Sequence, residues 1–240
     1  MLKICYLYPD LLNLYGNWGN MSSLLKRCEW RQIDVEITAV HLGEFVDFEP
    51  VDIVYLGTGS EKECRLVLED MAHHKQGLRQ AIERGMVMLT VGSGIQLMGM
   101  YWVTDEGEKV SGLGLIDLYT RMTSKYLVGD CVISMQLAGS EVKIVGFENH
   151  NEHTYLGPDL SPLGKVLYGH GNNGEDGMEG FRYKNVFGSN LGPILPKNPM
   201  LADVLLGTAL QNKKSPVKFL FLDDTLEKRA VQVMVERLLK

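Results

Sequence analysis

Apolar strand-like segments alternate with helical patterns along the N-terminal part of the chain, and this alternation limits the possible folds more than any other feature. The strand candidates are residues 2–8, 35–39, 51–56 and 86–91. Apolar residues recur at helical spacing at Met21, Leu24, Leu25 and Cys28, and further helical segments are predicted at residues 66–71 and 78–82. Strands that alternate with helices form parallel sheets covered on both faces. The sequence therefore predicts an α/β protein.

The C-terminal half is predicted to continue the same domain. Its strand candidates are shorter and more polar, at residues 126–135, 142–147, 165–168 and 183–187. No linker rich in proline or serine and no run of charge separates them from the first half. We therefore expect one domain over residues 1–240, ending in an amphipathic helix capped by residues 223–225.

Composition narrows the possible partners and location. Apolar residues make up 45% of the 240 residues, which is enough to build a core, and the net charge of −6 argues against binding to nucleic acid. No segment reaches the roughly 18 apolar residues of a membrane span, and the N-terminus does not resemble a signal peptide. We expect a cytoplasmic protein without membrane insertion. The cysteines are scattered and predicted to be free thiols, with no metal site: Cys5, Cys28, Cys64 and Cys131.

The strand at residues 86–91 breaks through Gly92, Ser93 and Gly94 into a short helix, which is the pattern of a nucleophile elbow. At such a turn a nucleophilic side chain projects beside backbone N–H groups that stabilise an oxyanion. Position 92 is glycine, which adopts strained turns but has no side chain with which to attack a substrate. Ligands of parallel sheets bind outside the carboxyl ends of the strands, so the loops after Leu56 and Val91 are predicted to form the site.

Several long motifs in one order resemble a known family. They are the segments 8–16, 146–150, 168–175, 183–189 and 192–198. On these motifs the chain resembles the GatD glutamine amidotransferase subunits of lipid II isoglutaminyl synthases, in the cobyric acid synthase-like branch of class I glutamine amidotransferases. The resemblance implies a flavodoxin-like α/β fold with a mixed, mostly parallel sheet and helices on both faces.

The resemblance also implies residues that this chain lacks. The family's nucleophilic cysteine falls on Gly92, and its histidine base is expected between Leu191 and Gly192, where none stands. The family's substrate-binding arginine falls on Tyr126. The oxyanion loop and pocket are expected at Gly57, Thr58, Gly59 and Ser93, with Gln96, Asn149 and His150 next to the pocket. No catalytic set is intact.

Other side chains are weak substitutes for the missing groups. Ser93 lies one residue beyond the apex of the elbow, so its side chain is expected to point elsewhere. Cys64 is expected to be a packed small hydrophobe. His150 is expected to fix a loop by hydrogen bonds rather than to transfer a proton. Restoring activity is predicted to require a cysteine at position 92, a histidine before Gly192 and an arginine at position 126 together.

Three functions remain open at this point. The first is a non-catalytic partner of a Mur-ligase-like subunit (MurT) in lipid II amidation. The second is a working glutaminase that supplies ammonia for amidation of D-glutamate in lipid II during peptidoglycan (cell wall) synthesis, with the changes compensated or introduced for study. The third is a small-ligand module that reuses the elbow pocket. The resemblance implies that ATP and Mg²⁺ belong to the partner subunit, that this chain holds no cofactor, and that glutamine is a possible ligand.

Overall fold

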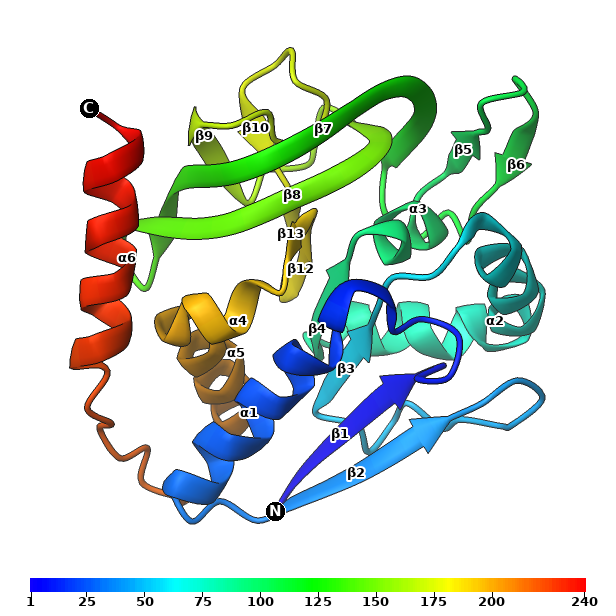
Figure 1. Ribbon diagram of the computed structural model, residues 1–240. Coiled ribbons are helices and arrows are strands. Elements are labelled where there is room, and N and C mark those ends of the chain that lie inside the picture. Colours follow the sequence, from blue (N-terminus) through cyan, green and yellow to red (C-terminus); the bar gives the residue numbers. More distant parts are fainter.

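The computed structural model describes residues 1–240 and contains two sheets with helices packed around the first (Figure 1). The first sheet has six strands in the order β11-β12-β4-β3-β1-β2. All neighbours are parallel except β11, which runs antiparallel to β12. The bounds are β1 (Leu2–Leu7), β2 (Val35–Val40), β3 (Ile53–Leu56), β4 (Val87–Val91), β11 (Phe181–Tyr183) and β12 (Val186–Ser189). The predicted parallel sheet is confirmed.

Helices cover both faces of this sheet, as predicted. Alternate residues of β1 point to opposite faces, so Ile4 joins one apolar cluster and Leu7 joins the other. The first cluster contains α1 (Trp18–Trp30), α4 (Ile194–Lys197) and α5 (Pro199–Asn212). The second contains α2 (Glu61–Glu83) and α3 (Ser93–Met98). A 3-10 turn, η1 (Leu14–Gly16), connects β1 to α1.

The second sheet is mostly antiparallel and is dominated by two long strands. Its members are β5 (Tyr101–Val103), β6 (Lys109–Ser111), β7 (Leu118–Leu137), β8 (Ser140–Leu156), β9 (Gly164–Tyr168), β10 (Met178–Glu179) and β13 (Leu191–Gly192). Strands β7 and β8 form an arch that crosses above the carboxyl ends of the first sheet (Figure 1). This arch roofs the edge at which parallel sheets bind ligands.

Three local predictions need correction. The two helical segments 66–71 and 78–82 are parts of one helix, α2, which begins with a capping box between Ser60 and Glu63. The predicted strand 183–187 is a hairpin: the chain turns at Lys184, whose φ is 52°. The second arm, β12, pairs in parallel with β4, and the first arm, β11, forms the antiparallel edge of the sheet. The predicted strands 126–135 and 142–147 are the middle parts of the much longer β7 and β8.

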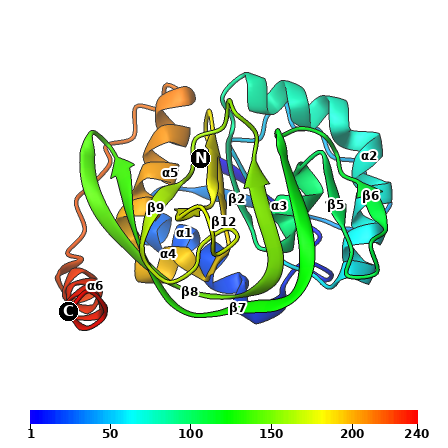
Figure 2. The ribbon, with the colours of Figure 1, turned by 90° about the horizontal axis from the view of Figure 1, so that it is seen from above.

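The C-terminal helix α6 (Thr225–Leu238) is confirmed, but its cap differs from the prediction. Asp224 occupies the N-cap position without making a side-chain cap bond, because its carboxylate binds the guanidinium of Arg27. The neighbouring Asp223 instead accepts a hydrogen bond from the Thr225 backbone N–H at 3.1 Å. The helix lies at the outer side of the molecule against the bend of the arch (Figure 2), where Val235 packs on Val132 and Val145.

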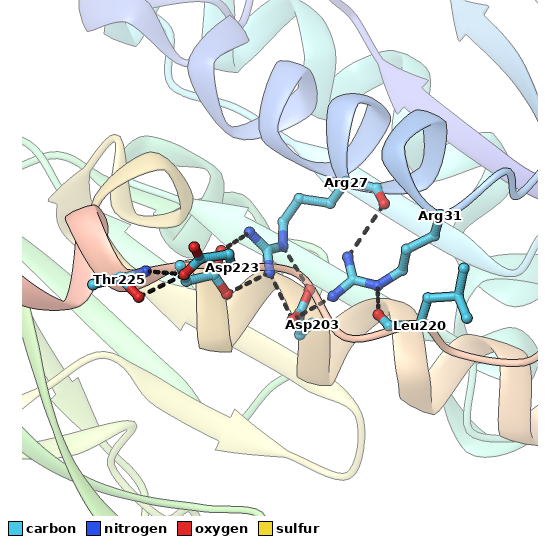
Figure 3. A network of polar contacts seen from close by, with 7 residues as sticks. Arg27, Arg31, Asp203, Leu220, Asp223 and Thr225 are labelled. Atoms are coloured by element: carbon cyan, nitrogen blue, oxygen red, sulfur yellow. Dashed lines mark hydrogen bonds and ion pairs between the residues drawn. The ribbon is translucent and has the colours of Figure 1, made fainter.

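A buried ionic network ties this C-terminal segment to the body (Figure 3). Arg27 of α1 is bidentate to Asp203 of α5, at 2.6 and 2.7 Å, and also binds Asp224. Arg31 binds Asp203 at 2.7 Å and the carbonyl oxygen of Leu220 at 2.7 Å. The side chain of Arg27 is only 5% exposed. The network therefore fixes α1, α5 and the segment before α6 relative to one another.

Replacing Asp203 by alanine is expected to lower the free energy of unfolding by about 3 kcal/mol, because it leaves two buried guanidinium groups short of a partner. Guanidinium chloride unfolding measures the change. The matched control is Glu29→Ala, which breaks an exposed ion pair with Lys26 and should cost less than about 1 kcal/mol. Equal losses in the two variants would contradict a structural role for the network.

Candidate functional site

A pocket of about 540 Å³ lies between the carboxyl edge of the parallel sheet and the arch. Its wall comes from the segments after β1, β3, β4 and β12 and from the arch itself. Most of the residues singled out in the sequence line it: Thr58, Gly59, Gly92, Ser93, Tyr126, Asn149, His150, Leu191 and Gly192. Gly57 and Gln96 are not in the lining. The structure thus brings together residues from both halves of the chain, as the motifs imply.

Gly92 has the backbone conformation of an elbow. It stands between β4 and α3 with φ 53° and ψ −126°, a combination that side-chain-bearing residues adopt only under strain. Its backbone N–H donates to the carbonyl oxygen of Ser189 at 3.0 Å, which fixes the turn against β12. A Cβ at Gly94 would lie 2.7 Å from the carbonyl oxygen of Gly57, so the next glycine permits close approach of two loops. The elbow is built, and its apex carries no side chain.

Ser93 is engaged in holding the neighbouring loop. Its hydroxyl accepts from the Gly59 backbone N–H at 2.8 Å and donates to the Gly59 carbonyl oxygen at 2.9 Å. The Gly59 N–H is therefore bonded within the protein rather than directed at a ligand oxygen. This arrangement agrees with the expectation that Ser93 does not replace the nucleophile.

None of the four cysteines lines the pocket, and all four are buried and unpaired. Burial raises the pKa of the Cys64 thiol to about 11 and that of Cys5 to about 12. A thiol must lose its proton to act as a nucleophile, and burial in apolar surroundings opposes this. The pocket lining therefore contains no thiol group.

The two histidines of the arch make local hydrogen bonds. His150 is 7% exposed, and its Nδ1 lies 3.1 Å from the carbonyl oxygen of Glu152. Burial lowers the pKa of its imidazole to about 4, so the ring is neutral at pH 7. The Nε2 of His153 lies 3.2 Å from the carbonyl oxygen of Lys125. Between Ser189 and Gly192, where the base was sought, the chain has only Asn190 and Leu191.

A family model described as the CobB/CobQ-like glutamine amidotransferase domain matches residues 3–199. The chain belongs to this family.

Two relatives place the chain among the GatD proteins of that family. It is 40% identical over 237 residues to subunit GatD of lipid II isoglutaminyl synthase (glutamine-hydrolyzing) from Staphylococcus aureus, covering 98% of this chain and 96% of that protein. It is 38% identical over 214 residues to the same subunit from Streptococcus pneumoniae, covering 88% and 82%. The predicted resemblance to GatD is confirmed.

Solved structures support the fold. One crystal structure of a glutamine amidotransferase covers 86% of this chain and 98% of its own, with a TM-score of 0.58 at 17% identity. The glutaminase domain of Trypanosoma brucei CTPS, solved with bound acivicin, covers 92% and 97%, with a TM-score of 0.60 at 11% identity. The predicted class I glutamine amidotransferase-like fold is confirmed. No helix combines the length and apolar character needed to cross a membrane.

The charge of the pocket in this amidotransferase-family chain was not foreseen from the sequence. Its only charged lining residues are Glu61 and Glu152, and Glu61 is paired with Arg65 at 2.8 Å. No lysine or arginine lines the wall, and the predicted arginine position is Tyr126, whose side chain is 63% exposed. A ligand carboxylate would meet no cation here.

Part of the lining was also missed by sequence reasoning. These residues are Leu14, Tyr15, Asn17, Phe147, Glu152, Asn190 and Pro193. Most belong to, or directly adjoin, the motifs that carry the family resemblance, which was the available signal. Nothing in the local sequence indicates that these side chains meet at one pocket.

Two buried carboxyl groups lie behind the pocket wall. Glu179 accepts hydrogen bonds from the Ser189 hydroxyl at 2.6 Å and from the Asn190 backbone N–H at 3.2 Å. Glu148 accepts from the backbone N–H groups of His170 and Gly171. Burial raises the pKa of both carboxyl groups, that of Glu179 to about 7. Glu179 thus holds the segment in which the base was sought.

The stability of the protein is expected to depend on pH through Glu179. Because burial raises the pKa of Glu179, the folded protein binds the carboxyl proton of Glu179 more tightly than the unfolded chain does. The resulting contribution to the free energy of unfolding is complete below the unfolded pKa of about 4.3 and disappears as the pH rises through about 7. Between about pH 5 and about pH 8, wild type should lose roughly 3 kcal/mol relative to Glu179→Gln, measured by urea unfolding. The exposed Glu106→Gln is the control and should show a constant difference. A constant difference for Glu179→Gln as well would refute the assignment.

Proposed function

We propose that this chain is a non-catalytic GatD-type subunit of a lipid II isoglutaminyl synthase. The observation that carries the proposal is the retained elbow with glycine at its apex, at φ 53° and ψ −126°. Hydrolysis of glutamine through a thioester needs a thiolate at that apex and a base beside it. The four cysteines are buried outside the pocket lining, and burial lowers the pKa of His150 to about 4, which makes this histidine a weak base.

The proposed partner is a Mur-ligase-like subunit of the MurT type, which would bind ATP and Mg²⁺. The relatives are named as subunits of a synthase, which implies assembly with another chain. Exposed apolar side chains surround the pocket mouth: Leu14, Tyr15, Tyr126 and Phe147. Tyr15 is 70% exposed, and aromatic side chains of this kind are enriched in the central contacts of protein interfaces. We call these four residues the pocket rim.

In this proposal the subunit stabilises or positions the ligase, and ammonia reaches the reaction from solution. The amidation concerned is that of the D-glutamate α-carboxyl group in lipid II, during peptidoglycan synthesis. No residue of this chain takes part in the ATP-dependent step. The proposed work of the chain is therefore to bind its partner.

The purified chain is expected to release no glutamate from glutamine, either alone or with its ligase. Glutamate release is followed by a coupled dehydrogenase assay, with the S. aureus relative, which is named as glutamine-hydrolyzing, as positive control. With ammonium salts in place of glutamine, the complex should amidate lipid II. Glutamine turnover above background in either state would establish a working glutaminase and overturn the proposal.

The pocket rim is expected to bind the ligase. The double variant Tyr15→Ser/Tyr126→Ser should weaken the complex at least about tenfold, measured by titration calorimetry, because exposed aromatic anchors carry much of the binding energy of interfaces. The matched control is Phe45→Ser, which removes an aromatic ring that is 85% exposed and lies beside His74 of α2, outside the pocket lining. Unchanged affinity in the rim variant would exclude this surface. Failure to co-elute with any Mur-ligase-like protein would remove the proposed partner.

A further inference from the structure

Thr58 is the one side chain in a loop whose neighbours have no room for any. A Cβ at Gly57 would lie 1.9 Å from the carbonyl oxygen of Leu12, and one at Gly59 would lie 2.6 Å from Cδ2 of the same residue. Both distances are far below van der Waals contact. The loop therefore lies flat against the chain after β1, and only its middle position can carry a side chain.

The side chain of Thr58 points at the apex of the elbow. Its hydroxyl donates to the carbonyl oxygen of Val91 at 3.0 Å. A Cβ built on Gly92 would lie 2.4 Å from Oγ1 of Thr58 and 3.0 Å from its Cγ2. Both distances are shorter than favourable contacts, so a side chain at position 92 requires the Thr58 side chain to rotate away from Val91 or the backbone to shift.

The loop is also held in place from the other side. The Ser93 hydroxyl bonds both the N–H and the carbonyl oxygen of Gly59, and the Leu14 backbone N–H donates to the carbonyl oxygen of Thr58 at 2.9 Å. Moving Thr58 away from the elbow would break these bonds. These bonds oppose a shift of the loop away from the elbow.

We propose that Thr58 is a steric lock on the elbow, occupying the space of a side chain at position 92. This inference rests on the proposed function and deepens it, because two residues, Gly92 and Thr58, then maintain the absence of a nucleophilic side chain. It also extends the sequence-based list of changes needed for repair. Gly92→Cys, a histidine before Gly192 and Tyr126→Arg would have to be joined by Thr58→Gly.

Native-state thiol labelling tests the lock directly. The four natural cysteines are buried, so wild type should react slowly with iodoacetamide, and labelling of the variants reports on position 92. Gly92→Cys should melt roughly 5 °C below wild type and label slowly. Gly92→Cys/Thr58→Gly should regain most of that loss and label at least about tenfold faster at residue 92, as mass spectrometry of peptides shows.

A matched variant separates volume from hydrogen bonding. Gly92→Cys/Thr58→Val keeps the bulk of threonine without its hydroxyl, and it should label as slowly as Gly92→Cys. If Gly92→Cys does not fold, the cycle of Gly92→Ala, Thr58→Gly and their combination is followed by thermal unfolding. The combined variant should then melt higher than the sum of the single shifts predicts.

Two outcomes would overturn the lock. One is equal labelling of Gly92→Cys with and without Thr58→Gly, and the other is strictly additive melting shifts in the alanine cycle. Neither readout depends on glutamine turnover. Glutamate release by wild type would refute the proposed function while leaving these measurements valid, so the two failures are distinguishable.

Discussion

The site depends on backbone segments that lie closer together than side chains allow. The loop at Gly57–Gly59 rests on the chain after β1, and Gly94 brings the elbow against that loop. Each approach would be blocked by a single methyl group. These contacts align the ends of β1, β3 and β4, on which the pocket floor is built. The arch of β7 and β8 then closes the space from above.

Much of the fold could be predicted because its signals are local. Strands β1, β3 and β4 are short apolar runs, and their alternation with helices identifies the sheet type. The lengths of β7 and β8 were underestimated because the ends of both strands are rich in polar residues. Burial on one face only gives these ends a weak hydrophobic pattern. Helix α5 was not predicted at all. It is apolar around most of its surface, and a helix buried on several sides loses the periodicity that marks an amphipathic one.

The residues that line the pocket were predictable only in part, and the physical character of the pocket was not predictable. Family motifs pointed to Gly92, Tyr126 and His150, and the structure places all three in one lining. The missing arginine at position 126 is visible in the sequence, whereas the burial of His150 arises from tertiary packing. The contact between Thr58 and Gly92 joins residues of two separate loops. No local pattern reports such a contact, because it exists only once β3 and β4 are paired.

The close approach of Thr58 to position 92 has an evolutionary consequence. Under the proposed lock, threonine at position 58 is disfavoured as long as a side chain stands at position 92. The order of the two substitutions is therefore set by sterics. Reversal must run through the same steps backwards, and regaining a side chain at position 92 first would be selected against for stability. Under the proposed lock, a side chain at position 92 is gained more readily once the side chain at position 58 has become smaller.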